Sequence, residues 1–160
     1  MPKLLNLGCG PRFRPGPDWV NVDFTSAHPA VLAHDLRRGV PFPEGTFDAV
    51  YHSHVLEHFS PRDAEPFVRE CFRVLRPGGV LRVAVPDLEQ ICRLYLGALE
   101  GLGEGREGAR AEHEWLLLEL YDQAVRTRPG GEMAEHLRRL DPAAREFVVA
   151  RAGNVVREII

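Results

Sequence analysis

Residues 3–13 have the sequence KLLNLGCGPRF, and this stretch decides the fold. A short apolar run ends abruptly at Gly8, and Gly10 follows after a single residue. Because glycine has no Cβ, the backbone amides of such a turn can approach a ligand closely. The stretch therefore predicts a buried strand over residues 3–7 and a ligand-binding turn after it. A tight turn with nothing bound would show the same letters.

Further apolar segments extend this pattern along the first half of the chain. A helix is expected over 62–75, because its apolar residues recur at helical spacing between a start signal at Ser60-Pro61 and a stop signal at Pro77-Gly78-Gly79. Strands that are apolar on both faces and alternate with helices predict a parallel sheet with helices on its sides. The expected fold class is α/β, a doubly wound Rossmann-like sheet of about five recognisable strands. The other expected strands are 19–23 (WVNVD), 31–35 (VLAHD), 46–54 (TFDAVYHSH) and 80–85 (VLRVAV).

The second half of the chain has a helical pattern. Helices are expected over 88–99, over 111–125 and after Asp141-Pro142, with a glycine-rich connection between the first two. The last seven letters, NVVREII, suit either a strand or a helix. We expect one domain over residues 1–160, with a ligand-binding core at 3–87. The helical part, 88–160, would form either the side on which a second substrate, the acceptor, binds or an oligomer surface.

Composition places the chain among ordinary globular proteins. It is 44% hydrophobic and 27% charged, with a net charge of -3, which gives no sign of a nucleic-acid-binding surface. No apolar run approaches the roughly 20 residues of a membrane helix, and residues 1–10 lead straight into a strand without a signal peptide. Cys9, Cys71 and Cys92 form no Cys-x-x-Cys pair, so neither a disulfide framework nor a thiolate metal site is expected. These features predict a cytoplasmic location.

Acidic residues end the next two expected strands. A carboxylate at Asp23 could accept hydrogen bonds from both hydroxyls of a ribose, and Asp35 could accept one from an adenine amine. Taken alone, each of these acids is more simply explained as a solvated loop residue. A dinucleotide fingerprint would need glycine where Phe13 stands and an acid about 20 residues further on. A nucleoside ligand without phosphates, such as S-adenosylmethionine, therefore fits better than a nicotinamide dinucleotide.

Successive stretches of the first half together resemble the motifs of class I S-adenosylmethionine-dependent methyltransferases. They are LLNLGCG, WVNVD, HDL, FDAVYHSHVLEHF and FVRECFRVLRPGGVLRVAVPD, within residues 3–87. Small bacterial methyltransferases of the type 11 kind are the most similar, and some of them accompany cell-surface polysaccharide genes. The resemblance implies a Rossmann-like fold, S-adenosyl-L-methionine as cofactor and a small-molecule or saccharide acceptor.

The resemblance also assigns roles to individual residues. It implies that the turn at Gly8, Cys9 and Gly10 wraps the methionine part of the cofactor. Asp23 would hold the ribose, with Phe24 against the adenine. The remaining residues implied by the resemblance are Asp35 and Leu36, beside the adenine amine, and Ser53 to Val55, along the transfer site, with Ser53 and Val55 at its ends.

Two departures from the family pattern stand out. Asn6 occupies the position of the usual acid in the first strand, which weakens its expected contact with the cofactor amine. The sixth and seventh strands of the family are missing or unrecognisable, so the strand at 80–85 would be an edge that something must protect. A shortened protein, a truncated edge that starts in NVVREII, or cover from another subunit, as in a homodimer, would each explain the gap. These departures motivate an alternative, a non-catalytic S-adenosylmethionine-binding subunit or sensor.

The stretch HVLEH, residues 54–58, also matches the H-x-x-E-H pattern of inverted zinc peptidases. That chemistry needs both histidines on one helix face and a further ligand, whereas the stretch directly follows an expected strand, so we expect no metal. His54 and His58 are instead candidate general bases, needed where the acceptor carries a proton. Capping or packing roles would account for the same histidines. Asp87 suits either the acceptor entrance or a helix N-cap.

Overall fold

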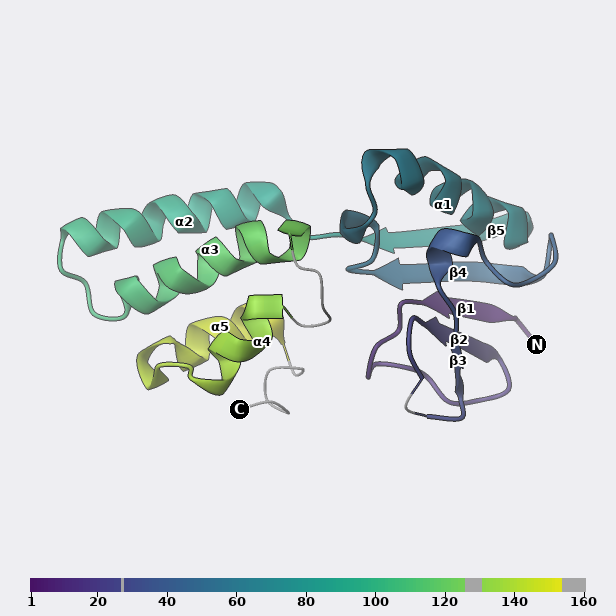
Figure 1. Ribbon diagram of the computed structural model, residues 1–160, viewed down its shortest axis with the longest axis horizontal. Coiled ribbons are helices and arrows are strands. Elements are labelled where there is room, and N and C mark those ends of the chain that lie inside the picture. Colours follow the sequence, from purple (N-terminus) through teal and green to yellow (C-terminus); the bar gives the residue numbers. More distant parts are fainter. Residues whose placement is uncertain (27, 126–130, 154–160) are drawn as a thin grey trace. The chain divides into compact units, whose positions relative to one another are not determined.

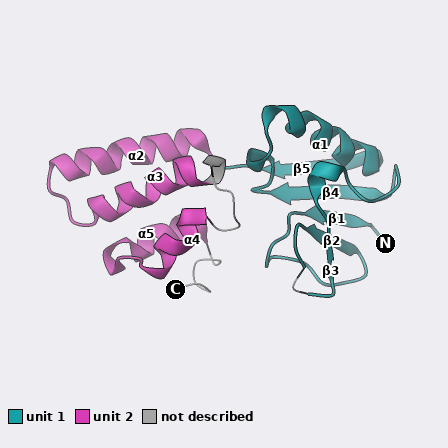
Figure 2. Cartoon of the chain, viewed as in Figure 1, with its two compact units in different colours: residues 1–86 teal, residues 87–160 magenta. Residues whose placement is uncertain are grey.

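The computed structural model describes residues 1–26, 28–125 and 131–153. The chain forms two compact units, residues 1–86 and 87–160 (Figure 2). Their boundary falls at Pro86 and Asp87, next to the expected limit of the ligand-binding core.

Unit 1 contains a sheet of five parallel strands in the order β3-β2-β1-β4-β5 (Figure 1). The chain moves outward from β1 through β2 to β3 and then returns to the other side of β1 with β4. That reversal is typical of doubly wound sheets, so the predicted Rossmann-like α/β class is confirmed. The strands are β1 (Leu4–Leu7), β2 (Trp19–Asp23), β3 (Val31–Ala33), β4 (Phe47–Ser53) and β5 (Leu75–Ala84).

One face of the sheet is covered by α1 (Pro61–Val74), which lies alongside β4 and β5 (Figure 1). The helix begins as its sequence predicts, because the Ser60 hydroxyl accepts the backbone N–H of Asp63 and a proline follows at the first helical position. Its apolar stripe is buried against inward-facing residues of the central strands. This core contains Leu5, Leu7, Val50, Phe67, Cys71 and Val74, all at most 2% exposed.

The opposite face carries no α-helix in the described part of unit 1. The β1–β2 connection contains Pro11, Pro15 and Pro17, which disfavour a helix there. A buried asparagine on β2 fixes the position of this connection. The Asn21 side chain accepts the N–H of Arg14 at 3.1 Å and donates to the Arg14 carbonyl at 2.8 Å, so it holds the connection against the sheet.

Strand β5 is longer than the sequence pattern predicts. It starts at Leu75, which pairs with Phe47, and the next pair is Ala49 with Val80. The register shift between these pairs accommodates the Pro77-Gly78-Gly79 segment as an irregularity of the strand. The outer positions Val80 and Val85 are 61% and 50% exposed, so the expected protection of this edge stays a prediction.

Unit 2 is helical throughout its described residues (Figure 1). Asp87 is the N-cap of α2, since its carboxylate accepts the N–H of Gln90 at 2.9 Å, which confirms the helix-cap interpretation of that residue. Trp115 and Val148 are fully buried in its core. The elements are α2 (Leu88–Gly103), α3 (Ala109–Val125), α4 (Gly131–Arg138), η3 (Pro142–Ala144) and α5 (Arg145–Ala152).

The sequence pattern did not predict α4. Its N-terminus is capped from a distance, because the Asp122 carboxylate accepts the backbone N–H of Glu132 at 2.7 Å and of Met133 at 3.4 Å. The ambiguous segment 154–160 lies outside the described residues. Among the described helices, none combines the length and apolar character needed to cross a membrane.

Candidate functional site

The carboxyl ends of all five strands meet at one edge of the sheet, where open α/β sheets bind ligands. The turn after β1 lies at this edge. Gly8 and Gly10 have φ values of +62° and +52°, in the left-handed region that favours glycine. A Cβ on Gly8 would collide with the Val55 side chain, whereas a Cβ on Gly10 would meet nothing within 4 Å. The turn thus packs inward at Gly8 and presents bare backbone to open space at Gly10.

Asp23, at the end of β2, is joined directly to this turn. Its Oδ2 atom accepts the backbone N–H of Gly10 at 2.6 Å. Between the glycines, Cys9 donates its N–H to the carbonyl of Val22 at 3.2 Å. Burial, together with the Asp23 charge, raises the pKa of the Cys9 thiol to about 11, so the thiol stays protonated at neutral pH. Cys9 therefore contributes its backbone N–H to this turn, and Asp23 contributes its carboxylate.

A second contact joins the ends of β2 and β3. The Phe24 ring is 61% exposed, and the Arg37 guanidinium lies 5.9 Å from its centroid. Arg37 also donates to both oxygens of Asp35, at 2.9 Å from Nε to Oδ1 and 2.7 Å from its terminal nitrogen to Oδ2. The hydrogen bonds from Arg37 lower the pKa of Asp35 to about 2. Next along the chain, Leu36 packs against the hydrophobic core.

Asn6, in the middle of the site-forming strand β1, is 5% exposed. Its amide donates to Oδ1 of Asn21 at 3.2 Å, and Asn21 in turn holds the backbone of Arg14. The structure thus gives Asn6 a place in a buried amide pair that holds the β1–β2 connection. The expected contact with the cofactor amine stays a prediction.

The end of β4 carries the histidine-rich stretch. Ser53 is the last residue of the strand, and His54 follows with φ +55°, an uncommon conformation for a residue with a side chain. A 3-10 turn, η2, then runs over Leu56–His58. Val55, just before it, is 8% exposed and belongs to the hydrophobic core. The histidines of H-x-x-E-H therefore do not share a helix face, as zinc peptidases require.

Glu57, in η2, interacts with the histidines on either side of it in the sequence, His54 and His58. Its Oε1 atom is 3.2 Å from Nδ1 of His54, and its side chain is 16% exposed. Burial acts to raise the pKa of Glu57, but the contact with His54 and the charges of His54 and His58 outweigh it and lower that pKa. The carboxylate is therefore ionised at neutral pH. No group of three or more metal-ligating side chains is arranged around a metal position in the described ranges.

His52 lies one strand position below, fully buried against the Phe67 ring at 5.2 Å between centroids. Neither ring nitrogen has a hydrogen-bond partner within the described part of the chain. Burial lowers the pKa of His52, so its imidazole is neutral at neutral pH. A buried polar group of this kind calls for a functional or structural explanation.

Two site residues escaped the sequence analysis. Arg37 contacts both Phe24 and Asp35, and Asn21 holds the backbone of Arg14 in the β1–β2 connection, yet neither belongs to an expected strand end. The alternation of β2 could have identified Asn21, because a polar residue at an inward position of a buried strand needs a partner. Arg37 gave no such signal.

The groups at this edge of the sheet suit a nucleoside with an amino-acid tail. Open space above Gly10, a partly buried carboxylate at Asp23 and an exposed aromatic ring at Phe24 follow one another along the edge. These groups match, in this order, the amino-acid tail, the ribose diol and the planar base of such a ligand. The arrangement therefore fits S-adenosylmethionine without requiring a phosphate site.

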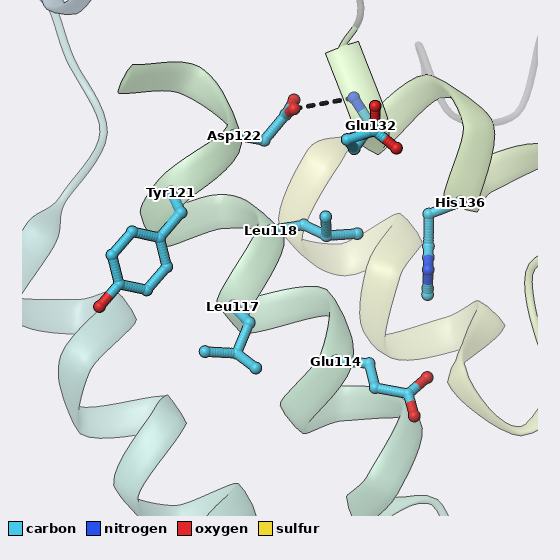
Figure 3. Close-up of a pocket in the computed structure, with 7 residues that line it drawn as sticks. All are labelled: Glu114, Leu117, Leu118, Tyr121, Asp122, Glu132 and His136. Carbon is cyan, nitrogen blue, oxygen red and sulfur yellow. Dashed lines mark hydrogen bonds between the residues drawn. The ribbon is translucent and has the colours of Figure 1, made fainter. Parts of the chain in front are cut away.

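Unit 2 contains a pocket of about 480 Å³ between α3 and α4 (Figure 3). Leu117, Leu118 and Tyr121 give it an apolar wall, and the Tyr121 side chain is 64% exposed. Such a volume lies in the range of small-molecule pockets. The remaining lining residues are polar: Glu114, Asp122, Glu132 and His136.

Comparison with known proteins gives a consistent picture. Residues 19–83 match the family described as methyltransferase domain. The chain is 46% identical over 104 residues to a probable S-adenosylmethionine-dependent methyltransferase of Mycolicibacterium smegmatis, covering 52% of this chain and 38% of that protein. It is 35% identical over 78 residues to the ubiquinone/menaquinone biosynthesis C-methyltransferase UbiE of Pasteurella multocida, covering 47% of this chain and 25% of the relative.

Two probable S-adenosylmethionine-dependent methyltransferases of Mycobacterium tuberculosis strains are 44% identical over 48 residues, which cover 30% of this chain and 17% of each relative. The chain thus spans well under half the length of these curated relatives.

Proposed function

We propose that the chain is a class I S-adenosylmethionine-dependent methyltransferase, which binds S-adenosyl-L-methionine at the carboxyl edge of the unit 1 sheet and transfers its methyl group to an acceptor. The cofactor supplies a methyl carbon on a positively charged sulfur and leaves as S-adenosylhomocysteine. One observation carries the proposal. The carboxylate of Asp23 and the bare backbone of Gly10 are held together at 2.6 Å, directly where parallel sheets bind nucleosides.

In this proposal each strand end contributes one part of the cofactor site. The turn at Gly8, Cys9 and Gly10 takes the methionine part, and Asp23 takes the ribose hydroxyls. The open space above Gly10 and the inward packing of Gly8 on Val55 support the first role. The engagement of Oδ2 in the Gly10 bond supports the second, because it orients the carboxylate toward the edge.

The adenine is assigned to the second group of residues. The exposed Phe24 ring offers it a stacking face, and the Asp35 carboxylate and Leu36 backbone flank its amine. In the structure Arg37 occupies the space near Phe24 and binds Asp35, so Arg37 must move aside or stack on the base. Asn6 supports the site through Asn21, and Ser53 and Val55 line its transfer end.

Catalysis then rests mainly on holding donor and acceptor close and aligned, with water excluded. His54 and His58 are the proposed general bases for an acceptor that carries a proton. The 58% exposure of the His54 side chain supports this role, since a base must reach the acceptor. Imidazole has the right basicity for such work near neutral pH.

The acceptor is proposed to be a small molecule or a saccharide, and unit 2 is proposed to bind it or a second copy of the chain. The pocket beside Leu117 and Tyr121 supports an acceptor with an apolar part. A cytoplasmic location is proposed because the cysteines are free in the structure, including the exposed Cys92.

Two measurements on the same preparation test the function. Calorimetry with S-adenosylhomocysteine reports binding, and release of S-adenosylhomocysteine from S-adenosylmethionine over a panel of phenols, saccharides and amines reports transfer. We expect heat in the first and turnover in the second. Heat without turnover on any acceptor would favour the alternative, a non-catalytic S-adenosylmethionine-binding subunit or sensor. No heat would contradict both.

A further inference from the structure

Glu57 has an unusual environment for a carboxylate. Its side chain is 16% exposed, and neither carboxylate oxygen has a hydrogen-bond partner within the described residues. Burial of a charged carboxylate is costly unless the charge is paired. The contact with His54 offsets this cost, because it helps to lower the pKa of Glu57.

His54 is the neighbour placed to supply a donor. Its Nδ1 atom is 3.2 Å from Oε1 of Glu57, and this contact helps to lower the pKa of the carboxylate. Catalytic hydrogen bonds are often long or poorly aligned before the ligand arrives. The backbone of His54 is itself fixed, because its N–H donates to the carbonyl of Ala84 at 3.0 Å.

The conformation of His54 is what brings the two side chains together. A φ of +55° costs a residue with a Cβ of the order of 1 kcal/mol, and such strain is concentrated at functional sites. His54 takes this conformation directly after β4, and Oε1 of Glu57, three residues further on, faces its Nδ1 atom. At the same time the His54 side chain stays 58% exposed at the carboxyl edge of the sheet.

The other ionisable groups around Glu57 are imidazoles. His52 lies beneath it in the core and is neutral because burial lowers its pKa, and the charge of Glu57 opposes that effect. His58 follows directly in η2, and its charge helps to lower the pKa of Glu57. The charges that lower the pKa of Glu57 are those of His54 and His58, and the charge of Glu57 acts in turn on His52.

We propose that Glu57 is a positioning residue that holds His54 with its proton on Nδ1, so that Nε2 accepts the proton of a hydroxyl acceptor during methyl transfer. This inference rests on the proposed methyltransferase function and adds the acceptor class to it. A neutral imidazole bonded to a carboxylate through one nitrogen presents the other as a base. The same division of roles between a carboxylate, an imidazole and a hydroxyl operates in hydrolytic triads.

The step balances without any further reactant. The O–H bond of the acceptor breaks, its proton passes to Nε2 of His54, and an electron pair of the oxygen forms the new bond to the methyl carbon. The pair of the broken carbon–sulfur bond returns to sulfur, whose positive charge disappears. The imidazolium, stabilised by the Glu57 carboxylate, then releases its proton to water. An acceptor atom without a proton to lose would gain nothing from this arrangement.

Nitrogen NMR of the histidine side chains tests the inference on the protein without cofactor or acceptor. The ring signals of His54 are assigned by their loss in His54→Gln. In the wild-type protein near neutral pH we expect the Nδ1–H tautomer, whereas free histidine favours the Nε2–H form. In Glu57→Gln, whose folding is checked by thermal melting, we expect the balance to shift toward Nε2–H. Glu65→Gln, which removes an exposed carboxylate of α1 paired with Arg69, is the matched control and should change nothing.

A wild-type His54 with its proton on Nε2 would overturn the inference, whether or not Glu57→Gln folds. S-adenosylhomocysteine calorimetry on Glu57→Gln gives the second readout. We expect its affinity to stay within about threefold of wild type, because Glu57 acts on the proton and not on the cofactor. An affinity loss of tenfold or more in a folded Glu57→Gln protein would make Glu57 a structural support of the cofactor site, and the inference would fail. Failure of the proposed function is separate, since it would appear as absent heat in the wild-type protein.

Discussion

Asp23 and Gly10 are joined by a hydrogen bond of 2.6 Å between a side-chain carboxylate and a backbone N–H, across the carboxyl ends of two neighbouring strands. The bond fixes the shape of the turn and also orients the carboxylate. Oδ2 is used in the turn, and in the proposed complex the carboxylate also accepts the hydroxyls of the ribose. The contact therefore links the integrity of the turn to recognition of the ligand.

The two glycines of the turn should respond differently to alanine. In both, a positive φ makes alanine unfavourable by about 1 kcal/mol. Gly8→Ala should lose clearly more stability, because its Cβ collides with the Val55 side chain, whereas the Cβ of Gly10→Ala points into open space. Urea unfolding of the two variants measures the difference.

Gly10→Ala should instead weaken ligand binding. The folded Gly10→Ala protein should bind S-adenosylhomocysteine at least tenfold more weakly, since the methyl group fills the space assigned to the methionine part. Wild-type affinity in Gly10→Ala would show that nothing binds above this glycine.

An ion pair on α1 gives a prediction about stability and pH. Glu70 accepts the N–H of Val40 at 3.0 Å and is bound by Arg73, which also donates to the carbonyls of Val40 and Phe42. The Arg73 hydrogen bond lowers the pKa of Glu70 to about 2. Glu70→Gln should therefore lower the unfolding free energy by about 1 kcal/mol at neutral pH.

The sign of the pH effect follows from the lowered pKa. The stabilisation is present above the ordinary glutamate pKa of about 4.3 and is lost as the pH falls toward 2. The difference between wild type and Glu70→Gln should thus shrink across that window. Glu65→Gln, an exposed partner of Arg69 in the same helix, should cost less than about 0.5 kcal/mol at any pH. Equal effects of the two changes would contradict the assignment.

His52 gives a pH dependence of the same sign as Glu70, but at a higher pH. Burial lowers its pKa, so the unfolded chain binds a proton more readily than the folded one, and stability falls as the pH drops below about 6.5. His52→Leu replaces an unpartnered buried imidazole with an apolar side chain. We expect its unfolding free energy to equal or exceed that of wild type at pH 7.5 and to decline less between pH 7 and 5.5. A variant that declines as steeply as wild type would show that His52 is not the group responsible.

Much of the fold was accessible from local sequence signals. The strand around Leu5 and the helix after Ser60 have strong periodicity and clear stop signals, and the structure confirms both. Parallel order followed from strands that are apolar on both faces. These features depend on residues adjacent in the chain, and sequence patterns represent them directly.

Other features depend on contacts between distant residues. Helix α4 is short and begins at a glycine, and its cap comes from Asp122 on another helix, so no local pattern predicts it. The early start of β5 depends on the pairing of Leu75 with Phe47. Glycine and proline at 77–79 argued for a break, but the register shift absorbs them.

The candidate site also combines residues that the sequence indicates directly with contacts that only the folded chain reveals. Gly8, Gly10 and Asp23 stand out in the sequence because their residue types are specific to a strand-end turn. The contact of Glu57 with His54 depends on a left-handed backbone at a histidine, which no pattern indicates. Likewise, Arg37 joins the site only because the turn after Asp35 brings its guanidinium over Phe24.

The central claim is that the carboxylate of Asp23 grips the sugar of an adenosyl ligand, and a matched pair of variants tests it. Asp48 also accepts a backbone N–H at 2.6 Å, from Lys3, but it lies at the amino end of β4, so Asp48→Ala removes an equivalent hydrogen bond far from the proposed site. Titration calorimetry with S-adenosylhomocysteine should give a clear heat for wild type and Asp48→Ala, and an affinity at least tenfold weaker for Asp23→Ala. Absent heat in the wild-type protein, or equal affinities in the two folded variants, would contradict the account.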